Sequence, residues 1–184
     1  GNIIKAQVER STSKNHPNKN IEKRLQPATV LSEKEVSSNS QSDDGIDAVV
    51  NFVAADSCNQ VIEGNDMLQF NLKEMVVSSS CSEITVTLKH TGAMPANVMG
   101  HNWVLTNTAD FMPVATAGGS AGMGNNYVPV NDARVIAASA VIGGGAETSV
   151  TFSGDLLTAG GDYTFFCSFP GHYAIMKGLF VVRD

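Results

Sequence analysis

The sequence predicts an all-β domain, a sandwich or barrel of about eight strands with one short helix outside it. Two observations predict this fold. After Cys58 the chain consists of short β-like runs that glycine, asparagine and aspartate separate. Between residues 107 and 134 the alternation stops and small residues and glycines take over, which one short helix and irregular loops would explain.

The strands follow from side-chain alternation along the chain. Residues 67–77 and 83–90 alternate apolar and polar side chains, so each run would bury one face. Further strand-like runs cover residues 102–107, 149–154, 163–169 and 179–184. A chain of 184 residues is long enough for one domain with a core and too short for two large ones, so the strands should form one domain.

The first part of the chain has a different texture. Residues 1–54 are polar and weakly patterned, and serine, asparagine, lysine and proline occur in linker-like proportions. Residues 46–56 are apolar enough for a short helix or an extra strand, and His16 should be a solvated surface residue. The sequence therefore predicts an N-terminal extension or linker, residues 1–54, followed by a β domain, residues 55–184.

Charge and hydropathy exclude two classes of function. The net charge is −6, and residues 55–184 hold five Lys/Arg against eleven Asp/Glu, so the domain lacks the clustered positive charge that nucleic acid requires. No apolar run approaches the roughly 20 residues of a membrane span. The chain begins with Gly1 and shows no charged-then-apolar leader, so we expect a mature chain whose export signal has been removed.

Three cysteines suggest one disulfide and one thiol with a separate task. Cys58 and Cys81 each flank a strand-like segment and pair most naturally with each other. If they do, the compartment is oxidising, such as the periplasm or the cell envelope. Three reduced thiols in a cytosolic protein are the alternative, which cysteine counting alone leaves open.

Residues 165–178, FFCSFPGHYAIMKG, bring Cys167, His172 and Met176 into ten positions, and His101 starts a strand upstream. Two imidazoles, one thiolate and a weak thioether are the donors that select copper for one-electron transfer. Zinc would also accept cysteine and two histidines but has little use for methionine sulfur. Because strands would hold both ends of this loop, the donors should be fixed before the metal binds. His90 lies on an alternating strand without a sulfur neighbour, so we expect a partly buried histidine there and not a ligand.

Residues 55–184 resemble the azurins, small blue copper proteins of the cupredoxin family. The resemblance lies in the stretches EGNDMLQFN, VMGHNWVL, DARVIA, GGGAETSVTF and FFCSFPGHYAIMKG. It implies an eight-stranded Greek-key β-sandwich with a short external helix. It also implies one type 1 copper ion that passes electrons in the bacterial periplasm.

The resemblance also implies a ligand set. His101, Cys167 and His172 would be the equatorial ligands, Met176 the distant axial ligand, and the carbonyl of Gly100 a weak contact on the opposite side. Zinc remains possible as the metal of a recombinant sample, because the equatorial donors suit both ions.

Other residues take their roles from the same resemblance. Asn102 would tie the two ligand loops together and support the cysteine sulfur, and Phe169 would help to exclude water. Cys58 and Cys81 match the structural disulfide of the family, and Trp103 falls on its core strand, in a setting that should be unusually apolar.

A docking surface is implied around the ring edge of His172. Its residues would be Met94, Pro95, Val98, Met99, Phe169, Pro170 and Ala174. An apolar patch of this kind suits weak and brief docking, and c-type cytochromes and copper nitrite reductase are the partners that the family suggests.

Two rival functions and the extension stay open at this point. A copper carrier or scavenger that releases its metal is the alternative from another class, and a copper enzyme is a weaker third option because few spare ligands remain. The extension has a counterpart only in membrane-tethered relatives, which are anchored through a lipidated cysteine; residues 1–57 contain no cysteine. The extension would be either a spacer at the cell envelope or an element that alters the oligomeric state.

Overall fold

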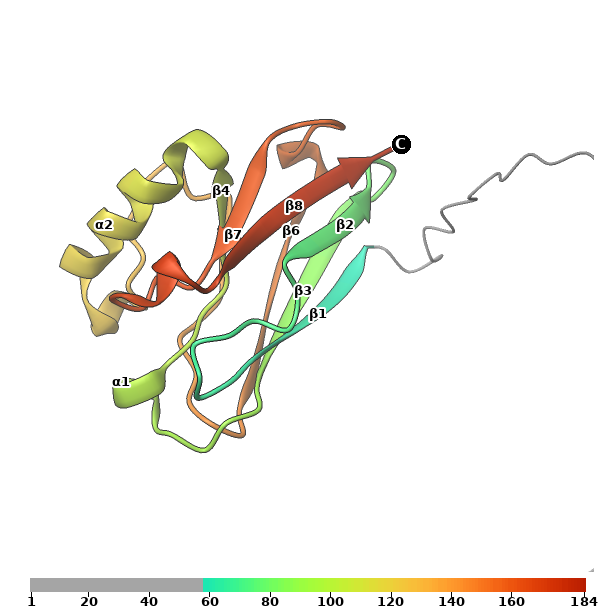
Figure 1. Ribbon diagram of the computed structural model, residues 1–184. Helices are drawn as coiled ribbons and strands as arrows, with labels where there is room; N and C mark the ends of the chain where they lie inside the picture. The colour runs from blue at the N-terminus through green and yellow to red at the C-terminus, as the bar shows by residue number, and fades with distance from the viewer. Residues whose placement is uncertain (1–57) are drawn as a thin grey trace, which may run out of the picture. The chain divides into compact units, whose positions relative to one another are not determined.

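Residues 58–184 form a β-sandwich of two sheets in the computed structural model, which describes these residues (Figure 1). The smaller sheet has the order β1 (Asn59–Gly64), β3 (Glu83–His90) and β6 (Glu147–Ser153). The larger sheet has the order β2 (Glu74–Ser78), β8 (Lys177–Arg183), β7 (Tyr163–Phe166), β4 (Val104–Asn107) and β5 (Ala137–Ala138). The predicted all-β sandwich of eight strands is confirmed. The expectations for residues 1–54 and 46–56, and for His16, lie outside the described residues.

Side-chain alternation builds the inner face of each sheet. Along β3 the side chains of Ile84, Val86 and Leu88 are buried, and the residues between them face outward. On the outer face, Thr85 and Thr87 pair through their hydroxyls with residues of β6. The buried residues form one core between the sheets, with Trp103 and four phenylalanine rings among its members.

Helix α2 (Phe111–Ala121) lies outside the sandwich, against the larger sheet (Figure 1). Its buried residues Phe111, Val114 and Ala115 form a second cluster with Val104 of β4 and Phe166 of β7. The segment between residues 107 and 134 therefore contains the predicted external helix. A further four-residue helix, α1 (Ala96–Met99), precedes β4.

The predicted strand over residues 67–77 is wrong in its first half, because β2 begins only at Glu74. The preceding residues form a loop in which the Asn65 side chain accepts hydrogen bonds from the backbone N–H groups of Met67 and Gln69, at 2.9 and 3.2 Å. Leu68 has a left-handed backbone, with φ 59°. Local side-chain-to-backbone bonding has replaced the strand ladder here.

Strand pairing brings distant segments together at one end of the sandwich. β4 and β8 both pair antiparallel with β7. The start of β4, the end of β7 and the start of β8 therefore meet at the same end of the larger sheet. No helix among residues 58–184 is long and apolar enough to cross a membrane.

Candidate metal centre

Two loops at this end of the larger sheet carry the predicted donors. Cys167 follows β7 directly and Met176 precedes β8 directly, and the Cys167 N–H donates to the Met176 carbonyl at 2.9 Å. His172 begins a short 3₁₀ turn between them, and its carbonyl accepts from the Met176 N–H at 2.8 Å. A hairpin closed in this way fixes all three side chains relative to the strands.

His101 reaches the same place from the strand side. It forms an isolated antiparallel bridge with Ile142, with two backbone hydrogen bonds of 3.0 and 2.9 Å. Its Nε2 lies 2.8 Å from the carbonyl oxygen of Asn65, which can only accept, so Nε2 carries the proton. The other ring nitrogen, Nδ1, therefore keeps its lone pair, and it faces Cys167.

The donor atoms converge. The Sγ of Cys167 lies 3.9 Å from Nδ1 of His101 and 3.7 Å from Nδ1 of His172, and all three donor atoms lie within 4.8 Å of one another. Metal bonds of about 2.0 Å to nitrogen and 2.3 Å to sulfur, arranged trigonally, would place sulfur and nitrogen about 3.7 Å apart. The spacing of these three residues therefore fits one metal ion.

Burial removes water from this cluster. The side chains of His101, Cys167 and Met176 are fully buried, and His172 is 5 % exposed. Met176 packs beside the His101 ring at Gly64: a Cβ on Gly64 would lie 2.8 Å from Cδ2 of His101 and 3.4 Å from Cε of Met176. This close approach requires glycine at position 64.

Burial also sets the ionisation of the donors. It raises the pKa of the Cys167 thiol to about 12, and it lowers the pKa of His172 to about 4 with help from the nearby His101 and His90. Burial lowers the pKa of His101 as well. At neutral pH the metal-free cluster is thus a neutral thiol facing two neutral imidazoles, and a cation that displaces the thiol proton would meet three lone pairs.

Backbone groups face the sulfur. Hydrogen bonds from the N–H groups of Asn102 and Phe169 oppose the effect of burial on the Cys167 pKa, because they favour the thiolate. The carbonyl oxygen of Gly100 lies 3.9 Å from Sγ. These three contacts come from the two ligand-bearing segments.

The Asn102 side chain joins the two segments directly. Its Oδ1 accepts from the Ser168 N–H at 2.8 Å, and its Nδ2 donates to the Ser168 hydroxyl at 2.8 Å. Phe169 stacks on the His172 ring with 4.4 Å between centroids. Both side chains therefore contact the residues beside or among the donors.

His90 is not one of the converging donors, in line with the sequence prediction, but it is fully buried, not partly buried. Its ring stacks on His101 at 4.3 Å. Its Nε2 donates to the Met99 carbonyl at 2.8 Å, and its Nδ1 accepts from the Gly92 N–H at 3.1 Å. Both ring nitrogens are thus used, and the ring serves as a packing surface for a ligand.

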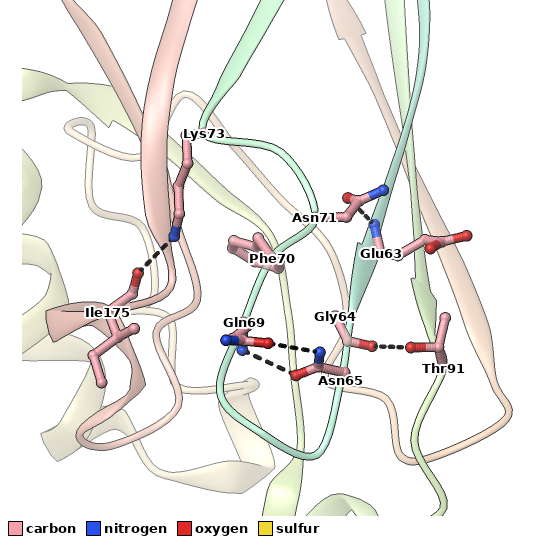
Figure 2. A pocket seen from close by; sticks show the side chains of 9 residues that line it. All are labelled: Glu63, Gly64, Asn65, Gln69, Phe70, Asn71, Lys73, Thr91 and Ile175. Atoms are coloured by element: carbon pink, nitrogen blue, oxygen red, sulfur yellow. Dashed lines mark hydrogen bonds between the residues drawn. The ribbon is translucent and has the colours of Figure 1, made fainter.

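A cavity of about 370 Å³ lies beside the loop that supports His101 (Figure 2). Figure 2 shows Asn65 and Gln69 hydrogen-bonded to each other, and Lys73 donating to the carbonyl of Ile175 at 3.3 Å. Ile175 precedes the ligand Met176. The cavity is lined by side chains that brace the ligand loops and contains none of the metal donors.

The predicted docking residues lie on the same two ligand-bearing loops. Met94 and Val98 are 42 % and 54 % exposed, Met99 is half-buried, and Pro95, Pro170 and Ala174 are exposed. None of these side chains is charged.

The disulfide lies apart from the donors, and the tryptophan lies in the core between the sheets. Cys58 and Cys81 are bonded, which confirms the pairing. They flank the starts of β1 and β3, whereas the donors belong to the loops at the opposite end of the sandwich (Figure 1). Trp103 is fully buried, and its Nε1–H has no hydrogen-bond partner among the described residues, so its setting is as apolar as predicted.

Sequence reasoning missed three residues that hold the site. Asn65 orients His101, and Asn126 accepts a hydrogen bond from Asn102. Asp66 accepts from the backbone N–H groups of Ala93 and Met94 and so ties two loops together. Asn65 and Asp66 stand in the stretch EGNDMLQFN, where an Asn-Asp pair after a glycine signals a turn.

Comparisons with known proteins give one consistent result. A sequence model of the family described as "Copper binding proteins, plastocyanin/azurin family" matches residues 56–183. Azurin-1 of Alcaligenes xylosoxydans xylosoxydans is 55 % identical over 127 residues, which cover 69 % of this chain and 98 % of that protein. Azurin of Bordetella pertussis is 54 % identical over 132 residues, or 72 % of this chain and 88 % of that protein. The solved structure of azurin Az-iso2 from Methylomonas sp. strain J matches with a TM-score of 0.67 and 42 % identity, and covers 70 % of this chain and 99 % of that one.

Proposed function

The chain belongs to the plastocyanin/azurin family of copper-binding proteins, and from this membership we propose that it shuttles single electrons between redox proteins of the bacterial periplasm. His101, Cys167, His172 and Met176 form its copper site. The protein is a type 1 copper electron carrier and not an enzyme. The observation that carries the proposal is the convergence of a buried thiol and two buried imidazoles within 4.8 Å.

The residues of the site supply rigidity and exclude water. When bound, copper contributes a Cu(I)/Cu(II) couple at a potential that the ligands tune. The closed hairpin holds Cys167 and Met176, and Asn65 holds the His101 ring. Packing and hydrogen bonds fix the donors, so they move little between the two oxidation states. The reorganisation energy that opposes electron transfer is therefore small.

The periplasmic location rests on the disulfide. Disulfides persist in oxidising compartments and are rare in the cytosol. The Cys58–Cys81 bond joins residues 23 positions apart in the chain, while Cys167 stays free and buried. An exported protein would keep this combination of one structural bond and one metal-binding thiol.

Electrons would enter and leave through His172. Its ring is almost buried, and uncharged docking residues flank it in the sequence at Phe169, Pro170 and Ala174. The other docking residues lie on the loop that precedes His101. We propose that this patch docks c-type cytochromes and copper nitrite reductase, since a small apolar surface permits brief contact and rapid release.

Replacing Met99 with Lys tests the patch. A charge in the docking surface should slow electron exchange with a c-type cytochrome and leave the visible absorption of the copper protein intact. Thr87→Lys, on the outer face of the smaller sheet, is the matched control and should leave exchange unchanged. Equal exchange rates in the Met99 variant and the parent would exclude this patch as the port.

A visible spectrum tests the function itself. The copper-loaded protein should absorb visible light intensely at about 600 nm, as a Cu(II)–thiolate site does. A protein that carries or scavenges copper ions would instead release copper readily, so competition with a chelator distinguishes it from an electron carrier. Rapid and complete loss of copper to a stoichiometric chelator would favour the scavenger.

For the extension we propose a separate role from the β domain. We infer a division into residues 1–54 and 55–184, supported by the change from linker-like composition to alternating strands. As a spacer, residues 1–54 would tether the domain at the cell envelope and let it reach several partners. Deleting residues 1–54 and measuring the size in solution tests this role, because an unchanged oligomeric state fits a spacer and a changed one indicates assembly.

A further inference from the structure

Two consecutive residues after α2 have a left-handed backbone. Asn126 and Tyr127 both have φ 53°. This region costs a residue with a side chain about 1–2 kcal/mol, less for asparagine, and such strain persists only where the surroundings enforce it. Two neighbouring residues in this conformation therefore call for an explanation in what they contact.

The C-terminal part of α2 and the 3₁₀ turn Met123–Asn125 that follows it hold the pair in place. The N–H groups of Asn126 and Tyr127 donate to the carbonyls of Met123 and Gly122, both at 2.9 Å. The carbonyl of Tyr127 approaches Gly118 of α2 so closely that a Cβ there would lie 2.1 Å from its oxygen. The helix thus sets the direction in which the pair presents its polar groups and its ring.

The pair makes three contacts toward the copper site. The carbonyl of Asn126 accepts from Nδ2 of Asn102 at 2.8 Å. The Asn126 side-chain oxygen accepts from the Val141 N–H at 2.9 Å. The Tyr127 ring packs edge-on against Phe169, with 5.0 Å between centroids.

Each contacted residue is in turn connected to the segment that carries a different donor. Asn102 is hydrogen-bonded to Ser168, which follows Cys167. Val141 precedes Ile142, whose backbone is bridged to His101.

The third contact runs through Phe169, which stacks on His172. The two residues therefore link the segments that carry all three equatorial donors.

We propose that Asn126 and Tyr127 are positioning residues of the copper site. They hold the segments of Cys167, His101 and His172 at fixed separations, so the donor set barely adjusts when the oxidation state changes. This inference rests on the proposed electron-carrier function. It adds to that function a source of rigidity outside both ligand-bearing loops, in the segment that follows α2.

Four variants of the full chain test the proposal. Asn126→Ala removes the acceptor for the Val141 N–H and disfavours the left-handed backbone, and Tyr127→Leu removes the ring. Asn126→Asp and Tyr127→Phe are the conservative variants, because they keep the acceptor and the ring. Asn131→Ala is the matched control: Asn131 has the same left-handed backbone, φ 55°, in the same segment and makes no hydrogen bond to the ligand-bearing segments among residues 58–184.

The first measurement is hydrogen exchange of the Ser168 N–H in the metal-free protein. Ser168 does not bond to Asn126 but to Asn102, so its protection reports transmission through the Asn102 side chain. Asn126→Ala should speed this exchange roughly fivefold or more relative to the parent, whereas Asn131→Ala should not. Because no copper is present, this result does not depend on whether the protein carries electrons.

The second measurement uses the copper-loaded protein. Asn126→Ala and Tyr127→Leu should alter the visible and electron paramagnetic resonance spectra and slow electron self-exchange by roughly tenfold. Asn126→Asp and Tyr127→Phe should keep the spectra and the self-exchange rate of the parent.

The proposal is overturned if Asn126→Ala and Tyr127→Leu lower the melting temperature as Asn131→Ala does while Ser168 exchange, spectra and self-exchange all match the parent. Should Asn126→Ala fail to fold, Asn126→Gly keeps the left-handed backbone and removes only the side-chain acceptor. The same readouts then decide the matter, with unchanged spectra and unchanged Ser168 exchange counting against the proposal.

Discussion

Gly64 shows how a single residue without a side chain shapes the copper site. Replacing it with alanine would drive a methyl group into the His101 ring, because the added Cβ would lie 2.8 Å from Cδ2. We expect Gly64→Ala to displace the ring, change the visible spectrum and destabilise the fold by about 1–3 kcal/mol. Spectroscopy and thermal unfolding of the copper-loaded variant measure both effects.

Gly124→Ala is the control for that substitution. Nothing lies within 4 Å of a Cβ added at Gly124, so its spectrum should match the parent. A normal spectrum in Gly64→Ala as well would show that the His101 ring tolerates the displacement.

Asp132 should make stability depend on pH in the acid range. Hydrogen bonds from Arg134 lower the Asp132 pKa from 3.8 to about 2. A carboxylate with a depressed pKa stabilises the folded state above its ordinary pKa, and this contribution is lost as the pH falls from 3.8 to about 2. Asp132→Asn should therefore flatten the pH dependence of the unfolding free energy in that window.

Acid titrations of unfolding check this expectation. Asp155→Asn, at an exposed carboxylate without an ion pair among residues 58–184, serves as the control. An identical slope between pH 4 and 2 for the parent and Asp132→Asn would contradict the role assigned to the Arg134 contact.

The donor residues could be predicted from sequence, whereas their supports could not. Cys167, His172 and Met176 stand close together in the chain, and copper chemistry singles out this combination of donors. Asn65, Asn126 and Tyr127 act through carbonyl groups or ring packing that depend on left-handed or turn backbone, and no residue-type rule identifies a particular carbonyl in advance. The burial of His90 likewise goes with the loop between β3 and β4, whose Gly92 and Met99 backbone groups bond both of its ring nitrogens.

At the scale of elements, α2 contains two adjacent glycines whose replacement by alanine should have opposite effects on stability. A Cβ on Gly118 would lie 2.1 Å from the Tyr127 carbonyl oxygen, whereas nothing lies within 4 Å of one on Gly119. Gly118→Ala should destabilise the protein by about 1–3 kcal/mol through overpacking. Gly119→Ala should stabilise it by about 0.5–1 kcal/mol, because alanine is the better helix former.

Chemical denaturation of the two variants gives both free energies in one experiment. If Gly118→Ala were as stable as Gly119→Ala, the approach of α2 to Tyr127 would be looser than the structure indicates.

The strands show where alternation suffices and where it fails. β3 was predictable because eight residues alternate without interruption. In residues 67–73 the same alternation occurs in a loop, since the Asn65 side chain bonds the backbone and Leu68 turns left-handed. β5 spans only two residues and is defined by its pairing with β4, so a local pattern could not indicate it.

At the scale of the whole molecule, the disulfide should stabilise the fold without affecting the spectrum of the copper site. Replacing both Cys58 and Cys81 with serine removes a cross-link over 23 residues, which should lower the free energy of unfolding by about 3 kcal/mol. The blue absorption should be unchanged, because the bond lies before the starts of β1 and β3, at the end of the sandwich away from the donors. Thermal unfolding and a visible spectrum of the double variant test both statements, and a changed spectrum would disprove the independence.

The parallel pairing of β2 with β8 has a consequence for biogenesis. β2 ends at Ser78 and finds its partner only in β8, which begins at Lys177, and Cys167 and Met176 stand just before that partner. A nascent polypeptide thus lacks both the closing strand and the sulfur donors until residues 167–183 have left the ribosome. The complete donor set can therefore form only after residue 176 has been synthesised, and the strand that closes the larger sheet beside β2 follows it directly.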